Sequence, residues 1–232
     1  KDSVSCEVDL EHPEVVVHAL VKESTCAIGI DLAGFDLAKR SYFIFTGPRA
    51  LKGSIAYATL RMAGYTGKGF VLDPFMRSGH IPIEAGLYAA GISAHYFTKE
   101  SFLCKNLLDL NMDAWDSRIV PESTIIGYDE LLHHVKSSQK NAKVAGLKDE
   151  VMFSKVNVEW LDTKCKENEV DFVVSYPPQM SRHRSEKDIR KIYKELFYSL
   201  DYVMSPKGRC VFVCNHSDLL IEEAKQYRFS LV

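Results

Sequence analysis

Residues 70–85, FVLDPFMRSGHIPIEA, decide the fold that the sequence predicts. An apolar strand ends at Asp73, a short turn contains Gly79, and the helix that follows carries Glu84. A turn of this kind presents backbone N–H groups at the start of a helix, and glycine lets a ligand approach the backbone closely. The stretch predicts a nucleotide-like binding site, although a strand-to-helix connection that binds nothing fits the same residues about equally well.

Strand-like apolar runs and helical patterns alternate after this stretch. The strand-like runs are residues 123–129, 151–156, 171–175 and 209–215, and the helical patterns are residues 131–145 and 187–204. We expect Pro206–Gly208 to end the last of these helices, and Cys210, Phe212 and Cys214 to be buried in the strand after it. Strands separated by helices form a mainly parallel sheet. The sequence therefore predicts an α/β, Rossmann-like doubly wound fold.

A small β-rich appendage is expected at residues 1–47, ahead of an α/β domain at residues 48–232. Three short alternating apolar runs indicate half-buried strands in the appendage: residues 4–10, 15–21 and 26–30. Helical spacing then starts near Leu51 and continues to Met62. The change of period places the boundary just after Gly47.

Composition restricts the classes of function. The chain of 232 residues has 29 basic and 31 acidic side chains, a formal net charge of −2. It lacks the overall basic bias of domains that bind nucleic acid mainly through phosphates, so any RNA contact must be local or supplied elsewhere. Six cysteines form no CxxC pair, which disfavours a disulfide framework and a zinc site. No metal is expected.

The apolar runs and the two ends of the chain bear on the cellular location and the completeness of the protein. No apolar run approaches the roughly 20 residues of a membrane helix, and no signal peptide is visible, so we expect a soluble cytoplasmic protein. The chain begins at Lys1 rather than at methionine, as a fragment or a processed protein would. It also ends at Val232, where we expect the last strand of such a sheet to continue.

Two acidic residues compete for the end of the second strand, where ribose hydroxyls are bound in Rossmann folds. Glu100 has the generic spacing from the glycine turn, whereas Asp129 closes a more apolar run. We prefer Asp129, which makes residues 94–122 an insertion. His133 and His134 follow on the next helix, and without a third ligand at suitable spacing they are expected at the surface.

Residues 73–85 resemble the first motif of methyltransferases that follow a THUMP domain, in which aspartate and proline precede a Gly-Ser-Gly-Thr turn and IPIEA. Residues 31–45 and 49–60 resemble the family's linker and its first helix, and residues 8–32 resemble the end of a THUMP domain. The resemblance covers nearly the whole chain. It implies a class I domain that uses S-adenosylmethionine to methylate RNA, as the tRNA guanine-N2 methyltransferases of archaea and bacteria do.

DFVVSYPPQM, residues 171–180, matches the place where amino-directed methyltransferases carry an Asn-Pro-Pro-Tyr motif. An exocyclic amine is a poor nucleophile because its lone pair is delocalised into the ring, so the enzyme must align the amine and stack the base. Here Tyr176 replaces the asparagine and Gln179 replaces the aromatic residue. A swapped arrangement, in which Tyr176 stacks and the Gln179 carbonyl accepts from the amine, would preserve the chemistry; backbone carbonyls of the loop are the alternative acceptors.

The resemblance implies roles for three groups of residues. The base-orienting, catalytic group is Tyr176, Pro177, Pro178 and Gln179. The cofactor-binding group is Leu51, Lys52, Asp73, Pro74, Phe75, Ser78, Gly79, His80, Asp129, Glu130, Asn157, Val158 and Ser175. Asn157 stands where the family has an aspartate that contacts adenine, and a turn asparagine without that role fits equally well. Arg182 and Arg184 form a local basic patch for RNA phosphates, or else an exposed mobile loop.

Departures from the family motifs leave two other functions open. Arg77 and His80 replace the first glycine and the threonine of the turn, which adds bulk where the methionyl end of the cofactor belongs. A domain that keeps the fold but has weakened or lost catalysis, and serves as an RNA-binding subunit, is therefore one alternative. An adenine-specific DNA methyltransferase is the other, because the Pro-Pro loop alone permits it. The modified nucleotide and the oligomeric state stay open.

Overall fold

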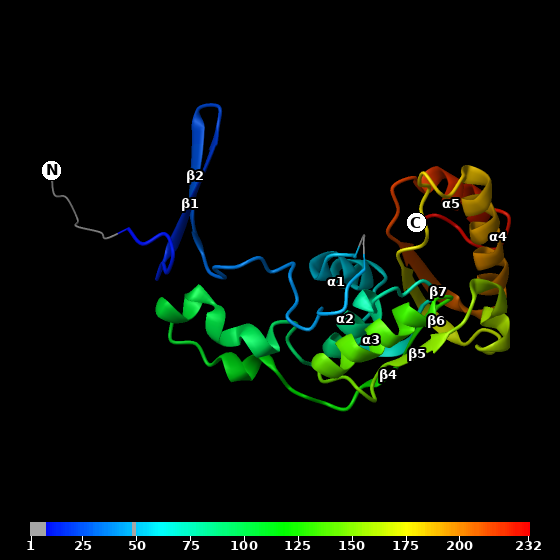
Figure 1. Ribbon diagram of the computed structural model, residues 1–232, viewed down its shortest axis with the longest axis horizontal. Coiled ribbons are helices and arrows are strands. Elements are labelled where there is room, and N and C mark those ends of the chain that lie inside the picture. The colour runs from blue at the N-terminus through cyan, green and yellow to red at the C-terminus, as the bar shows by residue number, and fades with distance from the viewer. Residues whose placement is uncertain (1–7, 48–49) are drawn as a thin grey trace.

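The computed structural model describes residues 8–47 and 50–232, and its centre is a parallel sheet of five strands (Figure 1). The strands are β3 (Lys68–Asp73), β4 (Glu122–Asp129), β5 (Met152–Lys155), β6 (Val170–Ser175) and β7 (Met204–Phe212). Their order across the sheet is β5-β4-β3-β6-β7, with every pair parallel. The chain builds outward from β3 in both directions, so the predicted doubly wound α/β fold is confirmed.

Helices cover both faces of the sheet. One face carries α1 (Gly53–Met62), α2 (His80–Ala89) and α3 (Leu132–Val144), and the other carries α4 (Glu186–Val203), α5 (Ser217–Ala224) and the 3-10 helix η4 (Val158–Thr163). Strand β3 shows why both faces are apolar: Val71 packs with the first group, whereas Phe70 and Leu72 pack with the second. Successive side chains of a strand alternate between faces, so a buried central strand must be apolar throughout.

Strand β7 differs from the sequence prediction in two respects. Helix α4 ends at Val203 and β7 begins at once, so Pro206–Gly208 lies inside the strand, at an irregularity in its pairing with β6, instead of ending the helix. Proline is tolerated there because β7 is an edge strand with one unpaired side. The edge position also leaves Cys210, Phe212 and Cys214 half-buried, and the expectation of a fully buried strand was wrong.

The N-terminal appendage is an antiparallel hairpin of β1 (Val16–Lys22) and β2 (Thr25–Asp31) that projects from the α/β body (Figure 1). These strands match two of the three predicted runs. Of the remaining run, residues 4–10, residues 4–7 lie outside the described part of the chain, and residues 8–10 form no strand. The strands are not half-buried as predicted, because no second layer covers either face of the described hairpin.

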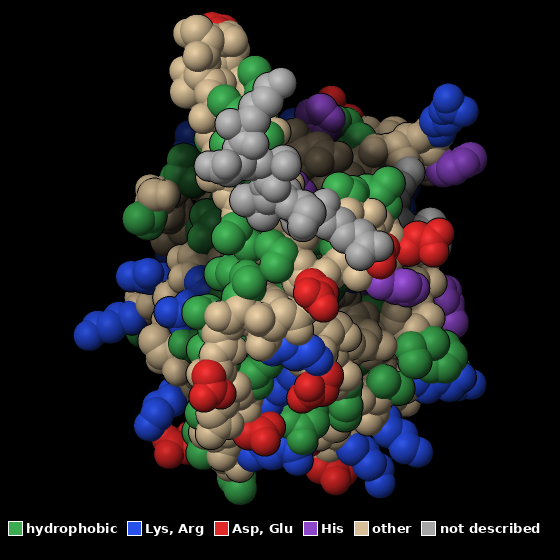
Figure 2. Space-filling view, turned by 90° about the vertical axis from the view of Figure 1, so that its left-hand side faces the viewer, with side chains coloured by type: hydrophobic (Ala, Val, Ile, Leu, Met, Phe, Trp, Pro, Cys, Tyr) green, Lys and Arg blue, Asp and Glu red, His purple; other side chains and the backbone are tan. Residues whose placement is uncertain are grey.

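Apolar side chains are therefore exposed on the hairpin. Val17, Leu20, Val21 and Ile28 are each more than half exposed. Figure 2 views the molecule from the side that carries the hairpin, and hydrophobic side chains gather on this face with charged ones of both signs around them.

The predicted insertion, residues 94–122, lies between α2 and β4 except for Glu122, which is the first residue of β4. It folds into three 3-10 turns, Tyr96–Ser101, Leu103–Asn106 and Met112–Trp115, which lie beside the base of the hairpin (Figure 1). The backbone N–H of Cys104 donates to the carbonyl of Leu32 at 2.9 Å, and that of Leu103 donates to Ala33 at 3.2 Å. Glu100 is exposed in a 3-10 turn of this insertion and does not end a strand of the parallel sheet, as Asp129 does.

A buried ion pair joins the linker to helix α2. Arg40 donates to both carboxylate oxygens of Glu84, at 2.6 Å from Nε and 3.2 Å from the terminal nitrogen, and the Tyr42 hydroxyl donates to the same carboxylate. The Arg40 and Glu84 side chains are 7% and 1% exposed. Burial, together with the charge of Glu84, raises the pKa of Tyr42 well above its ordinary value, so the hydroxyl keeps its proton. Glu84 thus neutralises the charge of Arg40 and also accepts the hydrogen bond of the buried Tyr42 hydroxyl.

Removal of Glu84 should therefore destabilise the domain strongly. We expect Glu84→Ala to lower the free energy of unfolding by about 3–5 kcal/mol, because it leaves the Arg40 charge buried without its counterion. Glu122→Ala is the matched control, since the Lys68–Glu122 pair is 71% exposed on both sides, and should change the free energy of unfolding little. Urea denaturation followed by circular dichroism measures both values, and equal losses would contradict a structural role for the buried pair.

Candidate functional site

The carboxyl ends of three neighbouring strands bring together residues that are distant in the sequence. Asp73 ends β3, Asp129 ends β4 and Ser175 ends β6, and all three side chains are buried. The Ser175 hydroxyl donates to Asp73 Oδ1 at 2.5 Å. In doubly wound sheets the connections leave in opposite directions at this edge, which opens a crevice for ligands.

The turn after β3 has the geometry that its glycine predicts. Gly79 has φ of +84° at the start of α2, and a Cβ there would lie 2.9 Å from the Cβ of Ser138. Asn141 Nδ2 donates to the Ser78 carbonyl at 3.0 Å, and the Ser138 hydroxyl donates to the Arg77 carbonyl at 2.9 Å. Helix α3 therefore holds the turn in place, and only glycine fits at its tightest point.

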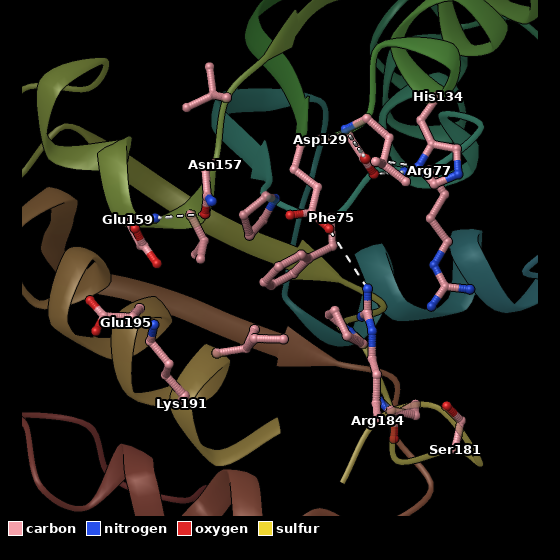
Figure 3. A pocket seen from close by; sticks show the side chains of 18 of the residues that line it. Phe75, Arg77, Asp129, His134, Asn157, Glu159, Ser181, Arg184, Lys191 and Glu195 are labelled. Atoms are coloured by element: carbon pink, nitrogen blue, oxygen red, sulfur yellow. Dashed lines mark hydrogen bonds and ion pairs between the residues drawn. The ribbon is translucent and has the colours of Figure 1, made fainter. Parts of the chain in front are cut away.

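A cavity of about 630 Å³ opens beside Asp129 (Figure 3). Eight of the residues predicted to bind the cofactor or to orient the target base line this cavity: Pro74, Phe75, Asp129, Glu130, Asn157, Val158, Pro178 and Gln179. Figure 3 shows Phe75, Asp129 and Asn157 around the hollow, each after a different strand, with Lys191 and Glu195 of α4 also on its wall. The Asn157 side chain accepts from the Glu159 N–H at 3.3 Å and so caps η4.

Asp129 is positioned by three protein donors. Oδ1 accepts from the Leu131 N–H at 2.9 Å and lies 2.8 Å from His134 Nδ1, while Oδ2 accepts from the Arg77 N–H at 3.0 Å. A carboxylate oxygen has two lone pairs, so Oδ2 retains capacity for a ligand hydroxyl. His134 is 23% exposed and contacts the site, which corrects its expected place on the surface.

A second, much smaller cavity of about 10 Å³ lies next to Asp73. Four of the residues that line it, Leu51, Asp73, Phe75 and His80, belong to the predicted cofactor-binding group, and the others are Met76, Arg77, Ile81 and Tyr176. The Arg77 guanidinium carbon lies 4.4 Å from the centre of the Tyr176 ring, and the His80 ring stacks on Phe43 with centres 3.6 Å apart. Side chains of the protein itself therefore fill this end of the crevice.

Burial controls the charge of the groups near the small cavity. It raises the pKa of Asp73 to about 7, against the opposing effect of the hydrogen bonds from Ser175 and Phe75. It also lowers the pKa of His80 to about 4, with the positive charge of Arg77 adding to the effect. At neutral pH His80 is uncharged and Asp73 is partly protonated.

The diproline loop is held from behind. Gln179 Nε2 donates to the Pro177 carbonyl at 2.9 Å, and the Gln179 side-chain carbonyl accepts from the Asn215 N–H at 3.1 Å. The Tyr193 hydroxyl of α4 donates to the Pro178 carbonyl at 2.9 Å. Gln179 is buried and its amide is engaged inside the protein, so the geometry favours a supporting role over the predicted contact with a target amine.

Of the remaining predicted residues, only Arg184 lines one of these two cavities. Ser78, Gly79 and Ser175 support the turn and Asp73, and the Lys52 carbonyl accepts the first hydrogen bonds of α1. Arg182 is exposed, whereas Arg184 lines the large cavity and lies 3.7 Å from Glu130.

Among the lining residues of the large cavity that sequence reasoning missed as cofactor or substrate contacts are Arg77, His134, Lys191 and Glu195. Arg77 carried a signal, as a bulky residue in a glycine turn. The other three depend on which helix face meets the crevice. Among the described residues, no cluster of His, Cys, Asp or Glu side chains is arranged to hold a metal ion, and no helix is long and apolar enough to cross a membrane.

The raised pKa of Asp73 predicts a pH dependence of stability. The unfolded chain releases this proton near pH 3.8 and the folded protein near pH 7. The free energy of unfolding of the wild type should therefore decrease as the pH rises from 3.8 to 7, by up to about 4 kcal/mol relative to that of Asp73→Asn. The variant retains an acceptor for Ser175 and Phe75 but has no proton to lose. Urea denaturation at pH 4 to 8 measures the difference, with Asp149→Asn as an exposed control. A constant difference across this range would disprove the elevated pKa.

Comparisons with known proteins agree with this geometry. The chain shares 28% identity over 219 residues with the tRNA (guanine(6)-N2)-methyltransferase of Methanocaldococcus jannaschii, covering 91% of the chain and 57% of that protein. It shares 26% identity over 199 residues with the ribosomal RNA large subunit methyltransferase K/L of Vibrio parahaemolyticus, covering 80% of the chain and 28% of that protein. The chain thus spans about half, or less, of the length of these curated relatives.

Solved structures show the same fold. SMU.472, solved in complex with S-adenosylhomocysteine, matches 93% of the chain and 56% of its own with a TM-score of 0.74 at 21% identity. TrmN from Thermus thermophilus matches 93% of the chain and 53% of its own with a TM-score of 0.69 at 22% identity. The family UPF0020, described as an RMKL-like methyltransferase domain, matches residues 40–230. The chain belongs to this methyltransferase family.

Proposed function

We propose that the chain is an S-adenosylmethionine-dependent methyltransferase domain that acts on an exocyclic amine of a base in RNA, with guanine in tRNA as the first target to test. The single observation that carries the donor assignment is the 630 Å³ cavity beside Asp129. The relatives named for tRNA and ribosomal RNA methylation support RNA as the substrate class. A THUMP domain at the N-terminal side, with the boundary near residue 47, stays part of this proposal.

The large cavity fits the adenosine part of the donor. Asp129 Oδ2 can accept a hydrogen bond from a ribose hydroxyl, because its other contact is the Arg77 N–H. Phe75 and Val158 supply apolar surface for the flat adenine ring, and Asn157 supplies a polar edge. The small cavity does not fit the amino-acid part in this arrangement, because Arg77 and His80 fill that end of the crevice.

When bound, the donor supplies an electrophilic methyl group, and the protein must hold the target amine in line with it. Tyr176 lines the small cavity and offers its ring for stacking on the target base. Pro177 and Pro178 keep this loop stiff, and Gln179 and Tyr193 fix its position from behind. Arg184, next to Glu130, and the exposed Arg182 lie on the side from which RNA would approach.

The filled small cavity favours a second candidate, a domain that keeps the fold as an RNA-binding subunit with weakened catalysis. Transfer of labelled methyl from S-adenosylmethionine separates the two. We expect the full chain to label tRNA and not DNA. Labelling of DNA instead would identify an adenine-directed DNA methyltransferase, and binding of RNA without any transfer would establish the second candidate.

Asp129→Asn tests the donor site directly. We expect it to weaken binding of S-adenosylhomocysteine by about 10- to 100-fold, because one hydrogen bond to a charged group is worth about 1.5–3 kcal/mol. Isothermal titration calorimetry measures the affinity, and thermal melting confirms that the variant is folded. Glu100→Gln changes the rival acidic residue, which is exposed in the insertion, and should leave the affinity unchanged. Equal affinities for both variants and the wild type would refute the role of Asp129.

The basic loop predicts a salt-dependent contribution to RNA binding. Arg182→Ala and Arg184→Ala should each reduce the slope of log affinity against log salt by about one, with similar losses for different RNA sequences, because phosphate contacts release counterions without reading bases. Fluorescence anisotropy with labelled tRNA at several salt concentrations measures the slope. Lys207→Ala, exposed in β7, is the control. An unchanged slope in the double variant would remove this loop from the RNA interface.

A further inference from the structure

The two ends of the crevice differ in a way that the proposed function does not explain. The end beside Asp129 has a volume of about 630 Å³, whereas the end beside Asp73 has about 10 Å³. The first accommodates an adenine nucleoside, and the second has no room for an amino-acid chain. Arg77 lines both cavities.

Arg77 is built into the turn with unusual backbone geometry. Its φ is +51°, in the left-handed region that favours glycine. Its N–H donates to Asp129 and its carbonyl accepts from Ser138, so the backbone is fixed on both sides. Figure 3 shows the side chain on the other side of the cavity from Asn157 and Glu159.

The side chain closes the crevice by stacking on the diproline loop. The guanidinium carbon lies 4.4 Å from the centre of the Tyr176 ring, a cation–π contact between the turn after β3 and the loop after β6. Asp73 is the carboxyl group of the small cavity, but it already accepts from Ser175 and Phe75. Burial also raises its pKa to about 7, and the positive charge of Arg77 opposes that rise.

We propose that Arg77 is a specificity-determining residue of the donor site, and that its stack on Tyr176 closes the half that would hold the methionyl chain. The closed form accepts adenine nucleosides with a short 5′ substituent. A ligand with the full amino-acid chain binds after Arg77 has left Tyr176, and its affinity is reduced by the free energy of that opening. This inference rests on the proposed donor site and assigns to Arg77 a selectivity that a glycine at this position would lack.

Two ligands that differ in the amino-acid chain test the proposal. S-adenosylhomocysteine carries this chain, and 5′-methylthioadenosine ends in a methyl group. With the full chain and isothermal titration calorimetry, we expect Arg77→Gly to bind S-adenosylhomocysteine about 5- to 10-fold more tightly than the wild type, the strength of a partly exposed cation–π contact. The affinity for 5′-methylthioadenosine should change less than about twofold, because its site is open in both forms.

Arg118→Gly is a matched control. Arg118 also has a positive φ, of +45°, and its guanidinium carbon lies 4.2 Å from the centre of the Tyr96 ring, in the insertion. Removing it should leave the ratio of the two affinities at the wild-type value. Tyr176→Leu provides an independent variant if Arg77→Gly fails to fold. It removes the aromatic ring on which Arg77 stacks, and it should likewise increase the affinity for S-adenosylhomocysteine relative to that for 5′-methylthioadenosine.

The outcomes separate the proposal from the function on which it rests. If the ratio of the two affinities is the same in Arg77→Gly as in the wild type, the closure by Arg77 is overturned and the nucleoside site remains. The same holds if 5′-methylthioadenosine binds but S-adenosylhomocysteine binds to neither form. Weaker binding of S-adenosylhomocysteine to Arg77→Gly would also overturn it, because the guanidinium would then be a partner of the ligand. Failure of every folded form to bind either ligand would remove the donor site, and the inference with it.

Discussion

The buried hydrogen bond between Ser175 and Asp73 joins the two halves of the sheet at the edge where the site lies. It links the ends of β3 and β6, the strands between which the order of the sheet changes direction. Asp129, at the end of β4, then holds the turn that leaves β3 through the Arg77 N–H. Three strand ends and one turn are thereby held in a fixed relation, and the crevice has its shape from them.

The same rigid edge produces an asymmetric crevice. Backbone contacts fix the strand ends and the turn, so the volume of the crevice depends on a few side chains that extend from them. Where the side chains are those of Asn157 and Val158, a large cavity remains. Where they are Arg77 and Tyr176, almost none does. Side chains at this edge thus set the ligand space without altering the fold, because the fold depends on the backbone and the core beneath.

The linker is coupled to this domain by charge, and the hairpin by hydrogen bonds. Arg40 and Tyr42 are held by Glu84 of α2, a buried group that stabilises the linker only in its docked position. The hairpin packs through its base on the insertion, by the backbone contacts of Cys104 and Leu103, and leaves its strands exposed. The α/β body and the appendage therefore differ in how much of their apolar surface is covered.

The sequence by itself determined the α/β fold, the position of the glycine turn and the position of Asp129 at the end of a strand, because these depend on periodicity and on local backbone geometry. Residues 70–85 specify a buried strand and a turn that only Gly79 can make, wherever the chain places them. The edge position of β7, the exposure of the hairpin and the inward direction of the Gln179 amide were decided by tertiary structure. So was the contact between Arg77 and Tyr176, which are 99 positions apart in the chain. Such features depend on which surfaces meet, and a linear pattern of apolar and polar residues carries no information about the distance between side chains on different strands.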